Sequence, residues 1–258
     1  MKKFIAITLT IVLVLALCVG CGKKNASDIP TLEAGKLIMS TNAAFPPYEM
    51  TDDAGNYIGI DVEIAQAIAE KLGLELQIDD MGFSAALEAA QNGSSDIVMA
   101  GVTVNEDRLA VMDFSDSYAT GIQVVIVKED SEITSIDDLE GKTIGTQMGT
   151  TGYIYASDTP ENGGYGEENV IPYDNGMTAV NALVNGQVDC VIIDNGPAQE
   201  FVKANPGLKI LEAEWVTENY AIGLAKGSEL TELINGALKD LIADGTVQKI
   251  VDKYIVAE

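Results

Sequence analysis

The sequence predicts an α/β protein whose sheets are mostly parallel and covered by helices. Short apolar runs typical of buried strands alternate with segments that carry apolar residues at helical spacing. Glycine ends several of the helical segments, as at Gly73 and Gly93. The alternation occurs twice, so the 258 residues contain two similar α/β blocks behind an N-terminal segment of different character.

Residues 1–20 are predicted to be an export signal rather than part of the fold. A basic start precedes an uncharged apolar run that is short for a bilayer-spanning helix but suits a signal peptide. A small residue, Gly20, precedes Cys21, after which the chain turns polar. We therefore expect cleavage before Cys21 and lipidation of this cysteine. Residues 21–35 would then be the lipidated N-terminus and a flexible tether to the fold. An uncleaved anchor helix is the alternative.

The first block is predicted to begin with a strand and to continue in βαβ rhythm. Asp61 is expected to cap its first helix, which Gly73 ends. The predicted elements are strands 36–40, 74–78 and 96–100 and helices 61–72 and 84–92.

The second block repeats this rhythm. Ser135 and Asp138 match a capping box at the start of a short helix, and Pro197 stands where a helix begins. Another predicted helix buries Met177, Val180, Leu183 and Val184. The remaining predictions are strands 123–127, 142–146, 170–173, 189–193 and 220–224, a helix after the loop 145–152, and an amphipathic helix 228–244 whose apolar face includes Ile242.

The composition excludes several classes of function. The chain contains no histidine, which removes the usual general base of Ser or Cys nucleophiles and the means to assemble a zinc cluster. A formal net charge of −25 repels phosphate backbones, so we expect no nucleic-acid partner. Cys190 lies in an apolar run and is expected to be a small buried hydrophobe. We expect neither a metal nor a cofactor.

Arg108 is the only arginine among 15 basic residues, so lysine evidently serves wherever a simple surface cation is enough. The planar guanidinium is needed where two parallel hydrogen bonds meet a carboxylate or phosphate. Arg108 follows the predicted strand 96–100, and open α/β sheets bind ligands at the carboxyl ends of their strands. It is a candidate anion clamp. The alternative is a structural ion pair with a nearby acid such as Asp113.

Two further candidates lie at predicted strand ends. The turn 145–152, rich in glycine and threonine, lets backbone N–H groups approach an anion, and Met148 and Thr151 of this turn are candidate ligand contacts. Such a turn is alternatively plain structure. Asp194 ends the strand 189–193, where its carboxylate either holds an ammonium group or caps the next helix. A cationic fork, an anion-binding turn and a lone carboxylate together suit a zwitterionic amino acid.

Motifs spread along the chain carry a resemblance to a known family. They are Phe45-Pro-Pro-Tyr48, Gly59-Ile-Asp61, Asp96-Ile-Val-Met-Ala-Gly-Val-Thr103, Arg108, Asp113-Phe-Ser115, Leu139-Glu-Gly-Lys-Thr-Ile-Gly145, Gly186-Gln-Val-Asp189 and Asp194. With them, residues 36–256 resemble the amino-acid-binding lipoproteins of bacterial ABC importers, solute-binding family 3, which have the type II periplasmic-binding-protein fold. The resemblance implies two lobes joined by two crossing strands, residues 36–122 with 217–258 and residues 123–216, with the ligand cleft between them.

The resemblance also implies roles for individual residues. Arg108 looks like the clamp of the ligand α-carboxylate, assisted by Thr103 and Thr151, and Asp194 looks like the acceptor of the α-amino group, beside the carbonyl of Gly101. The other matching positions are Phe45 and Phe83, aromatic walls around the ligand side chain; Asn42, where relatives with basic or amide ligands often have aspartate; and Ala100, which with Gly101 replaces serines of some relatives.

The expected function is therefore extracytoplasmic capture of a free amino acid with a polar or basic side chain, without covalent chemistry. The expected partners are the membrane subunits of an ABC importer and, through the lipid on Cys21, the outer face of the cell membrane. We expect a monomer. Three alternatives stay open: a dehydratase-like enzyme on the same fold, an adhesin or sensor, and a binder of another small carboxylate. The sequence shows no signalling domain, so we expect a binding protein rather than a receptor.

Overall fold

The computed structural model describes residues 28–211 and 215–255. Its strands are β1 Lys36–Thr41, β2 Met50–Thr51, β3 Tyr57–Ile58, β4 Glu75–Asp80, β5 Ile97–Val98, β6 Met112–Lys128, β7 Ile144–Gln147, β8 Val170–Tyr173, β9 Cys190–Asp194, β10 Leu208–Ile210 and β11 Val216–Ala225. Nine of them form one sheet in the order β4-β1-β5-β11-β6-β9-β7-β8, with β10 paired to β6, and β2 and β3 form a separate ribbon.

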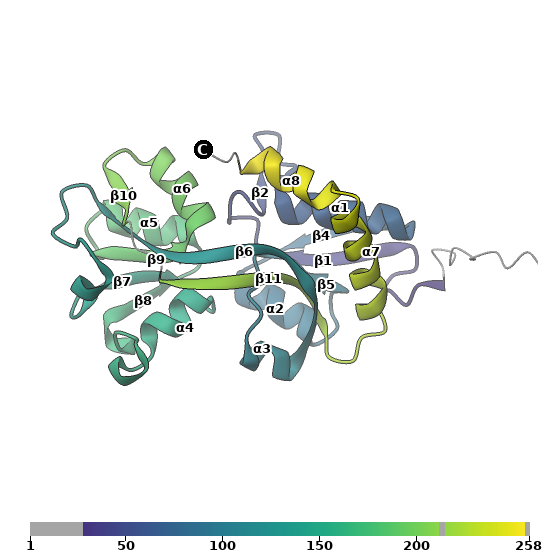
Figure 1. Ribbon diagram of the computed structural model, residues 1–258, viewed down its shortest axis with the longest axis horizontal. Coiled ribbons are helices and arrows are strands. Elements are labelled where there is room, and N and C mark those ends of the chain that lie inside the picture. Colours follow the sequence, from purple (N-terminus) through teal and green to yellow (C-terminus); the bar gives the residue numbers. More distant parts are fainter. Residues whose placement is uncertain (1–27, 212–214, 256–258) are drawn as a thin grey trace, which may run out of the picture.

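Two groups of parallel strands lie at opposite ends of this sheet. Strands β1, β4 and β5 form one group and β7, β8 and β9 the other. The long strands β6 and β11 pair antiparallel and run from one group to the other (Figure 1). The helices are α1 Ile60–Leu72, α2 Phe83–Gln91, α3 Glu106–Val111, α4 Thr151–Ser157, α5 Gly176–Val184, α6 Asn195–Ala204, α7 Thr231–Ala243 and α8 Thr246–Tyr254.

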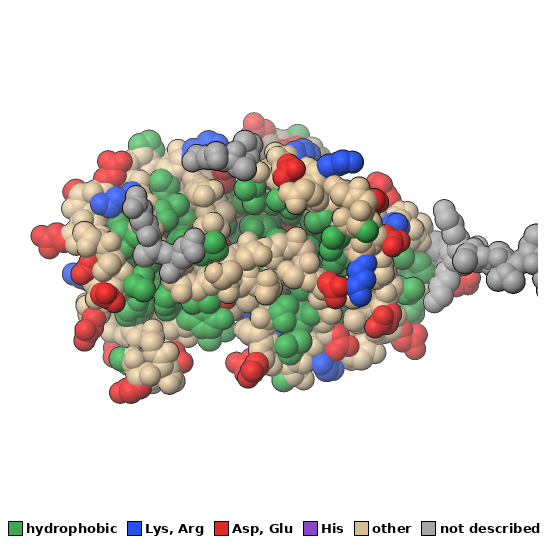
Figure 2. All heavy atoms as spheres, in the orientation of Figure 1, with side chains coloured by type: hydrophobic (Ala, Val, Ile, Leu, Met, Phe, Trp, Pro, Cys, Tyr) green, Lys and Arg blue, Asp and Glu red, His purple; other side chains and the backbone are tan. Residues whose placement is uncertain are grey.

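The predicted α/β architecture with two crossing strands is confirmed. Helices α1, α2, α3, α7 and α8 surround the first group of strands, and α4, α5 and α6 surround the second (Figure 1). Figure 2 shows acidic side chains scattered over this face of the molecule rather than gathered in one patch. Among the described residues, no helix is long and apolar enough to cross a membrane.

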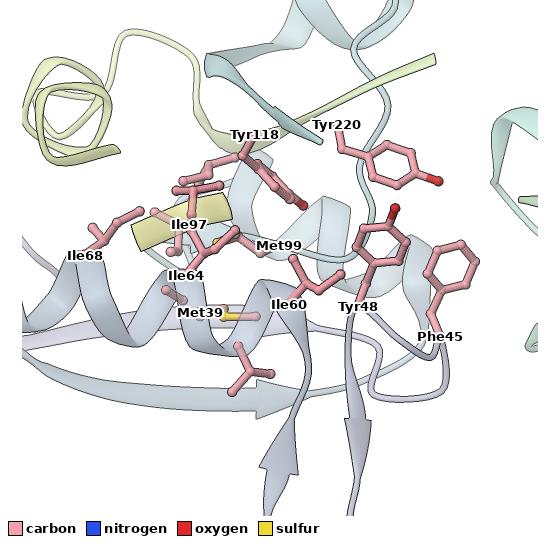
Figure 3. Close-up of a cluster of buried hydrophobic side chains, with 14 of the residues drawn as sticks. Met39, Phe45, Tyr48, Ile60, Ile64, Ile68, Ile97, Met99, Tyr118 and Tyr220 are labelled. Carbon is pink, nitrogen blue, oxygen red and sulfur yellow. The ribbon is translucent and has the colours of Figure 1, made fainter. Parts of the chain in front are cut away.

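Helix α1 shows how residue spacing builds the core at the first end. Ile60, Ile64 and Ile68 are four residues apart, so they share one helix face, and all three are fully buried. They lie against Met39 of β1 and Ile97 of β5 (Figure 3). Each such side chain contributes about 1.5–3 kcal/mol by leaving water. This packing fixes the N-terminus of α1 beside the ends of β1 and β5.

The start of α1 differs from the prediction. The helix begins at Ile60, and the residue before it, Gly59, makes no side-chain cap. Gly59 has a φ of 128°, and a Cβ there would stand 2.2 Å from the carbonyl oxygen of Tyr48, so only glycine fits. Asp61 does not cap the helix. It is fully buried, and its Oδ2 accepts a hydrogen bond from the backbone N–H of Gly101 at 2.9 Å.

Two predicted helix faces are also partly wrong. In α5, Met177 and Val184 are 54% and 45% exposed, because the helix packs through a narrower face. The predicted helix 228–244 begins at Thr231, leaves Ile242 43% exposed, and is followed by α8, which the sequence reading did not identify. Three other predictions are confirmed: Cys190 is buried, Val170–Tyr173 is a strand, and the capping box at Ser135 forms.

The segment before β1 is more tightly packed than a flexible tether. Ile29 is buried in the core, and the backbone N–H of Leu32 donates to Oδ1 of Asp96 at 2.8 Å. The other oxygen of Asp96 accepts from the N–H of Ile38 at 2.8 Å, so one carboxylate ties the segment to β1. The predicted signal peptide and Cys21 lie outside the described residues.

Candidate functional site

A pocket is lined by residues from both groups of strands. Nine of the ten residues predicted to contact a ligand line it, whereas Met148 does not and is 48% exposed. The nine are Asn42, Phe45, Phe83, Ala100, Gly101, Thr103, Arg108, Thr151 and Asp194. Glu49, Gln147 and Thr150 also line the cavity and were not predicted.

The cavity lies at the carboxyl ends of the parallel strands. Asn42 follows β1, Gly101 follows β5 closely, Gln147 ends β7 and Asp194 ends β9. Strands of one parallel group bring their carboxyl ends to the same edge, which explains why side chains far apart in sequence meet here. Because β6 and β11 place the two edges face to face, the cavity receives residues from both.

Arg108 projects from the short helix α3, whose N-cap Asn105 accepts a hydrogen bond from the Arg108 backbone at 2.8 Å. The side chain is only 8% exposed. Nη1 donates to the carbonyl of Thr103 at 2.8 Å, and Nη2 donates to the carbonyl of Gly149, from the other strand group, at 3.1 Å. The guanidinium carbon lies 5.6 Å from the ring centroid of Phe83, a cation–π contact.

Arg108 carries a charge that the described residues leave without an ion pair. Asp113, a predicted alternative partner, is instead 3.0 Å from Nζ of Lys226. Burial lowers the pKa of Arg108, and the negative charge of Glu218 opposes this shift. An arginine stays protonated under these conditions, so the cavity contains a fixed cation whose remaining N–H groups are available to an anion.

Asp194 is buried at the end of β9, where the hydroxyl of Tyr220 donates a short hydrogen bond to its Oδ1. It occupies the N-cap position of α6 but makes no side-chain cap, so its carboxylate is not used for helix capping. Burial raises the pKa of Asp194 to about 7, against the lowering effect of the Tyr220 hydroxyl. The ring of Tyr220 packs edge-on against the ring of Tyr48, with 5.1 Å between the two ring centroids, and this contact fixes its position (Figure 3).

Glu49 is a cavity residue that sequence reasoning missed. It is fully buried, and apart from the neighbouring carboxyl of Asp61 its carboxylate oxygens have no hydrogen-bond partner in the part of the chain that the structure describes. Burial raises its pKa well above the usual range, and the nearby charge of Asp61 raises it further. Glu49 directly follows the motif Phe45-Pro-Pro-Tyr48, which is the only signal that could have pointed to it. The raised pKa favours the neutral form of Glu49 in the absence of a cation, and a cation placed beside it would favour the ionised carboxylate.

Gln147, the last residue of β7, contacts the opposite edge of the cavity. Nε2 of Gln147 donates to Oδ1 of Asn42 at 3.0 Å, which joins β7 to the end of β1. Nδ2 of Asn42 donates to the carbonyl of Met81 at 2.9 Å, which fixes the orientation of the amide. Thr150 closes the turn behind Gln147 by donating from its hydroxyl to the Gln147 carbonyl at 2.8 Å.

The hydroxyls of Thr103 and Thr151 converge on a carboxylate behind the cavity. Both donate to Oε2 of Glu218, at 3.2 and 2.9 Å. Gln123 donates to the same oxygen at 2.9 Å. Glu218 and Gln123 belong to the crossing strands β11 and β6, so this hydrogen-bonded cluster links the crossing strands to residues from both edges of the cavity.

Comparison with proteins of known sequence and structure gives consistent results. The chain is 33% identical over 264 residues to the arginine-binding extracellular protein ArtP of Bacillus subtilis, with 100% of both chains covered. It resembles the arginine-, lysine-, histidine-binding protein ArtJ of Geobacillus stearothermophilus with a TM-score of 0.80 and 33% identity, over 86% of this chain and 96% of that one. An ancestral arginine-binding protein bound to glutamine gives a TM-score of 0.80 at 38% identity, over 87% and 100% of the chains.

The model of one protein family matches residues 37–257, which include every residue that lines the cavity. That match, with the full-length similarity to ArtP, shows that the chain belongs to the bacterial extracellular solute-binding proteins, family 3.

Proposed function

We propose that this protein captures a free amino acid with a cationic side chain outside the cytoplasm and delivers it to the membrane subunits of an ABC importer. One observation carries the proposal: a single cavity combines Arg108, which has no ion pair among the described residues, with the buried carboxyls of Glu49 and Asp194. Such an amino acid carries two positive groups and one negative group, so the charges of cavity and ligand are complementary.

The main-chain groups of the ligand would bind at two places. The guanidinium of Arg108 would clamp the α-carboxylate, with donors from Thr103 and Thr151. The carboxylate of Asp194 would accept from the α-ammonium, with the carbonyl of Gly101 beside it. Support comes from the convergence of these five residues on one cavity.

The ligand side chain would lie between the rings of Phe45 and Phe83, with the small residue Ala100 leaving room beside them. Its cationic end would meet Glu49, because Asn42 is neutral and its amide is already engaged with Met81 and Gln147. The named relatives bind cationic amino acids, while the ancestral protein also holds glutamine. The charge of the side chain is therefore the property to test.

We propose that binding closes two lobes, residues 36–122 with 217–258 and residues 123–216, around the ligand. The long strands β6 and β11 are suited to act as the hinge between them. Since the two lobes contribute different halves of the cavity, a ligand that contacts both favours the closed arrangement. Closure would then be the signal to the importer.

We also propose that the protein is a monomer without enzymatic activity and without a cofactor, anchored to the outer face of the cell membrane through lipid on Cys21. Metabolic labelling with a tagged fatty acid tests the anchor. The wild-type protein should be labelled and should sediment with membranes. Replacement Cys21→Ser should abolish both, and labelling that persists in this variant contradicts the anchor.

Isothermal titration with arginine and citrulline tests the proposed function. Citrulline has nearly the shape of arginine but a neutral side chain, so it isolates the contribution of charge. We expect arginine to bind more tightly by about 2 kcal/mol or more, because a neutral ligand leaves Glu49 unpaired. Equal affinities would contradict the cationic ligand, and the absence of binding by all twenty amino acids, ornithine, citrulline and cystine would contradict amino-acid capture altogether.

A further inference from the structure

Glu218 on the crossing strand β11 is a buried carboxylate outside the cavity lining. It is 4% exposed, and its Oε2 accepts hydrogen bonds from Thr103, Thr151 and Gln123. Its Oε1 has no hydrogen-bond partner among residues 28–211 and 215–255. Three donors on one oxygen hold the carboxylate tightly, and two of the three come from the residues proposed to bind the ligand α-carboxylate.

These two hydroxyls stand between Glu218 and the cavity. Thr103 and Thr151 line the cavity, whereas Glu218 lies behind them. A threonine hydroxyl has a single proton, which rotates to meet its acceptor. While that proton is donated to Glu218, it cannot be donated to a ligand. The hydrogen bonds to Glu218 and those to a ligand carboxylate are therefore alternatives.

Glu218 also lies at the place where the crossing strands connect the two strand groups. It pairs with Gly121 of β6, and the pairing register shifts just beyond it, between Tyr220 and Ala221. Its two threonine donors come from opposite edges of the cavity, Thr103 after β5 and Thr151 at the start of α4. Glu218 lies on a strand that joins the two sides of the cavity, and its carboxylate accepts one threonine hydrogen bond from each side.

We infer that Glu218 is an internal competitor of the ligand, whose carboxylate must give up the hydroxyls of Thr103 and Thr151 before the α-carboxylate of an amino acid can receive them. This inference rests on the proposed function. Exchange leaves Glu218 with the hydrogen bonds from Gln123 and Tyr155, and it brings a second negative charge towards Arg108. Both effects weaken the binding of any ligand that has an α-carboxylate. Glu218 is then a positioning residue that sets the upper limit of affinity.

The replacement Glu218→Gln tests the inference, because it keeps the shape of the side chain and removes its charge. Arginine and agmatine, which is arginine without the α-carboxylate, are the two probes for titration. We expect Glu218→Gln to lower the Kd of arginine about three- to tenfold, the equivalent of recovering one hydrogen bond. The Kd of agmatine should stay the same or rise, since agmatine does not compete for the hydroxyls and loses an attractive charge.

If arginine binds Glu218→Gln with unchanged or weaker affinity, Glu218 supports the site rather than competing for it, and the inference is overturned. A thermal unfolding curve shows whether the variant folds. Where it does not, Glu218→Asp replaces it, since the shorter carboxylate cannot hold both hydroxyls and should also tighten arginine binding. Failure of the proposed function has a different signature, in which the wild-type protein itself binds no amino acid.

Thr151→Val gives an independent measurement. In the wild-type protein, ligand binding moves the Thr151 hydroxyl from the Glu218 carboxylate to the ligand carboxylate, with no net gain of a hydrogen bond. Loss of the hydroxyl should therefore change the Kd of arginine little. In the Glu218→Gln background the hydroxyl serves the ligand alone, and Thr151→Val should weaken arginine binding severalfold more than it does in the wild type. Equal effects of Thr151→Val in the two backgrounds would overturn the competition between Glu218 and the ligand.

Discussion

The amides of Gln147 and Asn42 meet across the cavity, with Nε2 of Gln147 3.0 Å from Oδ1 of Asn42. Gln147 ends β7 and Asn42 follows β1, and these two strands are separated in the sheet by β5, β11, β6 and β9. A hydrogen bond between such distant strands depends on the two strand groups facing each other closely. In the proposed closure of the two lobes, this pair would stabilise the closed arrangement without contacting the ligand.

Replacement of Gln147 by alanine should speed ligand release. The closed arrangement loses one cross-cavity hydrogen bond, so we expect the Kd of arginine to rise about three- to tenfold. The increase should appear mainly in the dissociation rate, measured by stopped-flow mixing, because closure follows encounter. Gln187→Ala, at an exposed position, is the control. A Gln147→Ala variant with the dissociation rate of this control would show that the amide pair does not stabilise closure.

Arg108→Lys should weaken the binding of arginine by about 2 kcal/mol, since lysine keeps the charge but cannot form two parallel hydrogen bonds. The hydrogen bonds from the Arg108 guanidinium to the backbone carbonyls of Thr103 and Gly149 would also be lost. Titration with agmatine is the matched control, because it lacks the carboxylate that the guanidinium is proposed to clamp. If Arg108→Lys weakens arginine and agmatine equally, the arginine has a structural role instead.

Glu49→Gln should change ligand preference rather than abolish binding. The neutral amide no longer attracts a cationic side chain, so the advantage of arginine over citrulline should fall from about 2 kcal/mol towards zero. Asp53→Asn, at an exposed position in the same region, provides a charge-matched control. Competition titrations with arginine and citrulline measure the ratio. An unchanged ratio in Glu49→Gln would assign the side-chain end of the ligand to other residues.

The contrast between Arg108 and Glu49 shows how far the sequence could predict this site. Arg108 was predicted because it is the only arginine and follows a strand, two features visible in the sequence. Glu49 is one of many acids, and its burial results from tertiary contacts that no residue pattern records. Met148 illustrates the opposite error: it lies in the predicted turn, but its side chain is 48% exposed. A turn can be located from glycines, whereas the direction of each side chain depends on backbone geometry.

The fold was predictable to a similar degree. Apolar periodicity located α1 because Ile60, Ile64 and Ile68 all face the core. It failed in α5, where buried alanines at the contact with the sheet allow close packing and Met177 is left outside. Helix α8 was missed although Val247, Ile250, Val251 and Tyr254 stand at helical spacing and pack towards the core, so this pattern was readable and was overlooked. Features that repeat along one element are readable from sequence, and features set by a neighbouring element are not.

Asp194 should give protein stability and ligand affinity opposite dependences on pH. Burial raises its pKa to about 7, from 3.8, so the folded protein holds this proton more tightly than the unfolded chain does. Between pH 4 and 7 the free energy of unfolding without ligand should therefore fall as pH rises, by up to about 1.4 kcal/mol per unit. Asp61, raised to about 6, contributes in the same direction.

Ligand affinity should rise over the same range, because only the ionised carboxylate of Asp194 pairs with an α-ammonium group. Below pH 7 we expect the Kd of arginine to increase by up to about tenfold per unit, while above it the Kd should level off. Thermal unfolding and titration calorimetry between pH 5 and 8 measure the two trends on one sample. Asp194→Asn should reduce both slopes, with Asp61 still contributing to the slope of stability, and should weaken binding at pH 8. If that variant keeps the wild-type affinity at pH 8, the amino group is held elsewhere, and binding of another small carboxylate becomes the better interpretation.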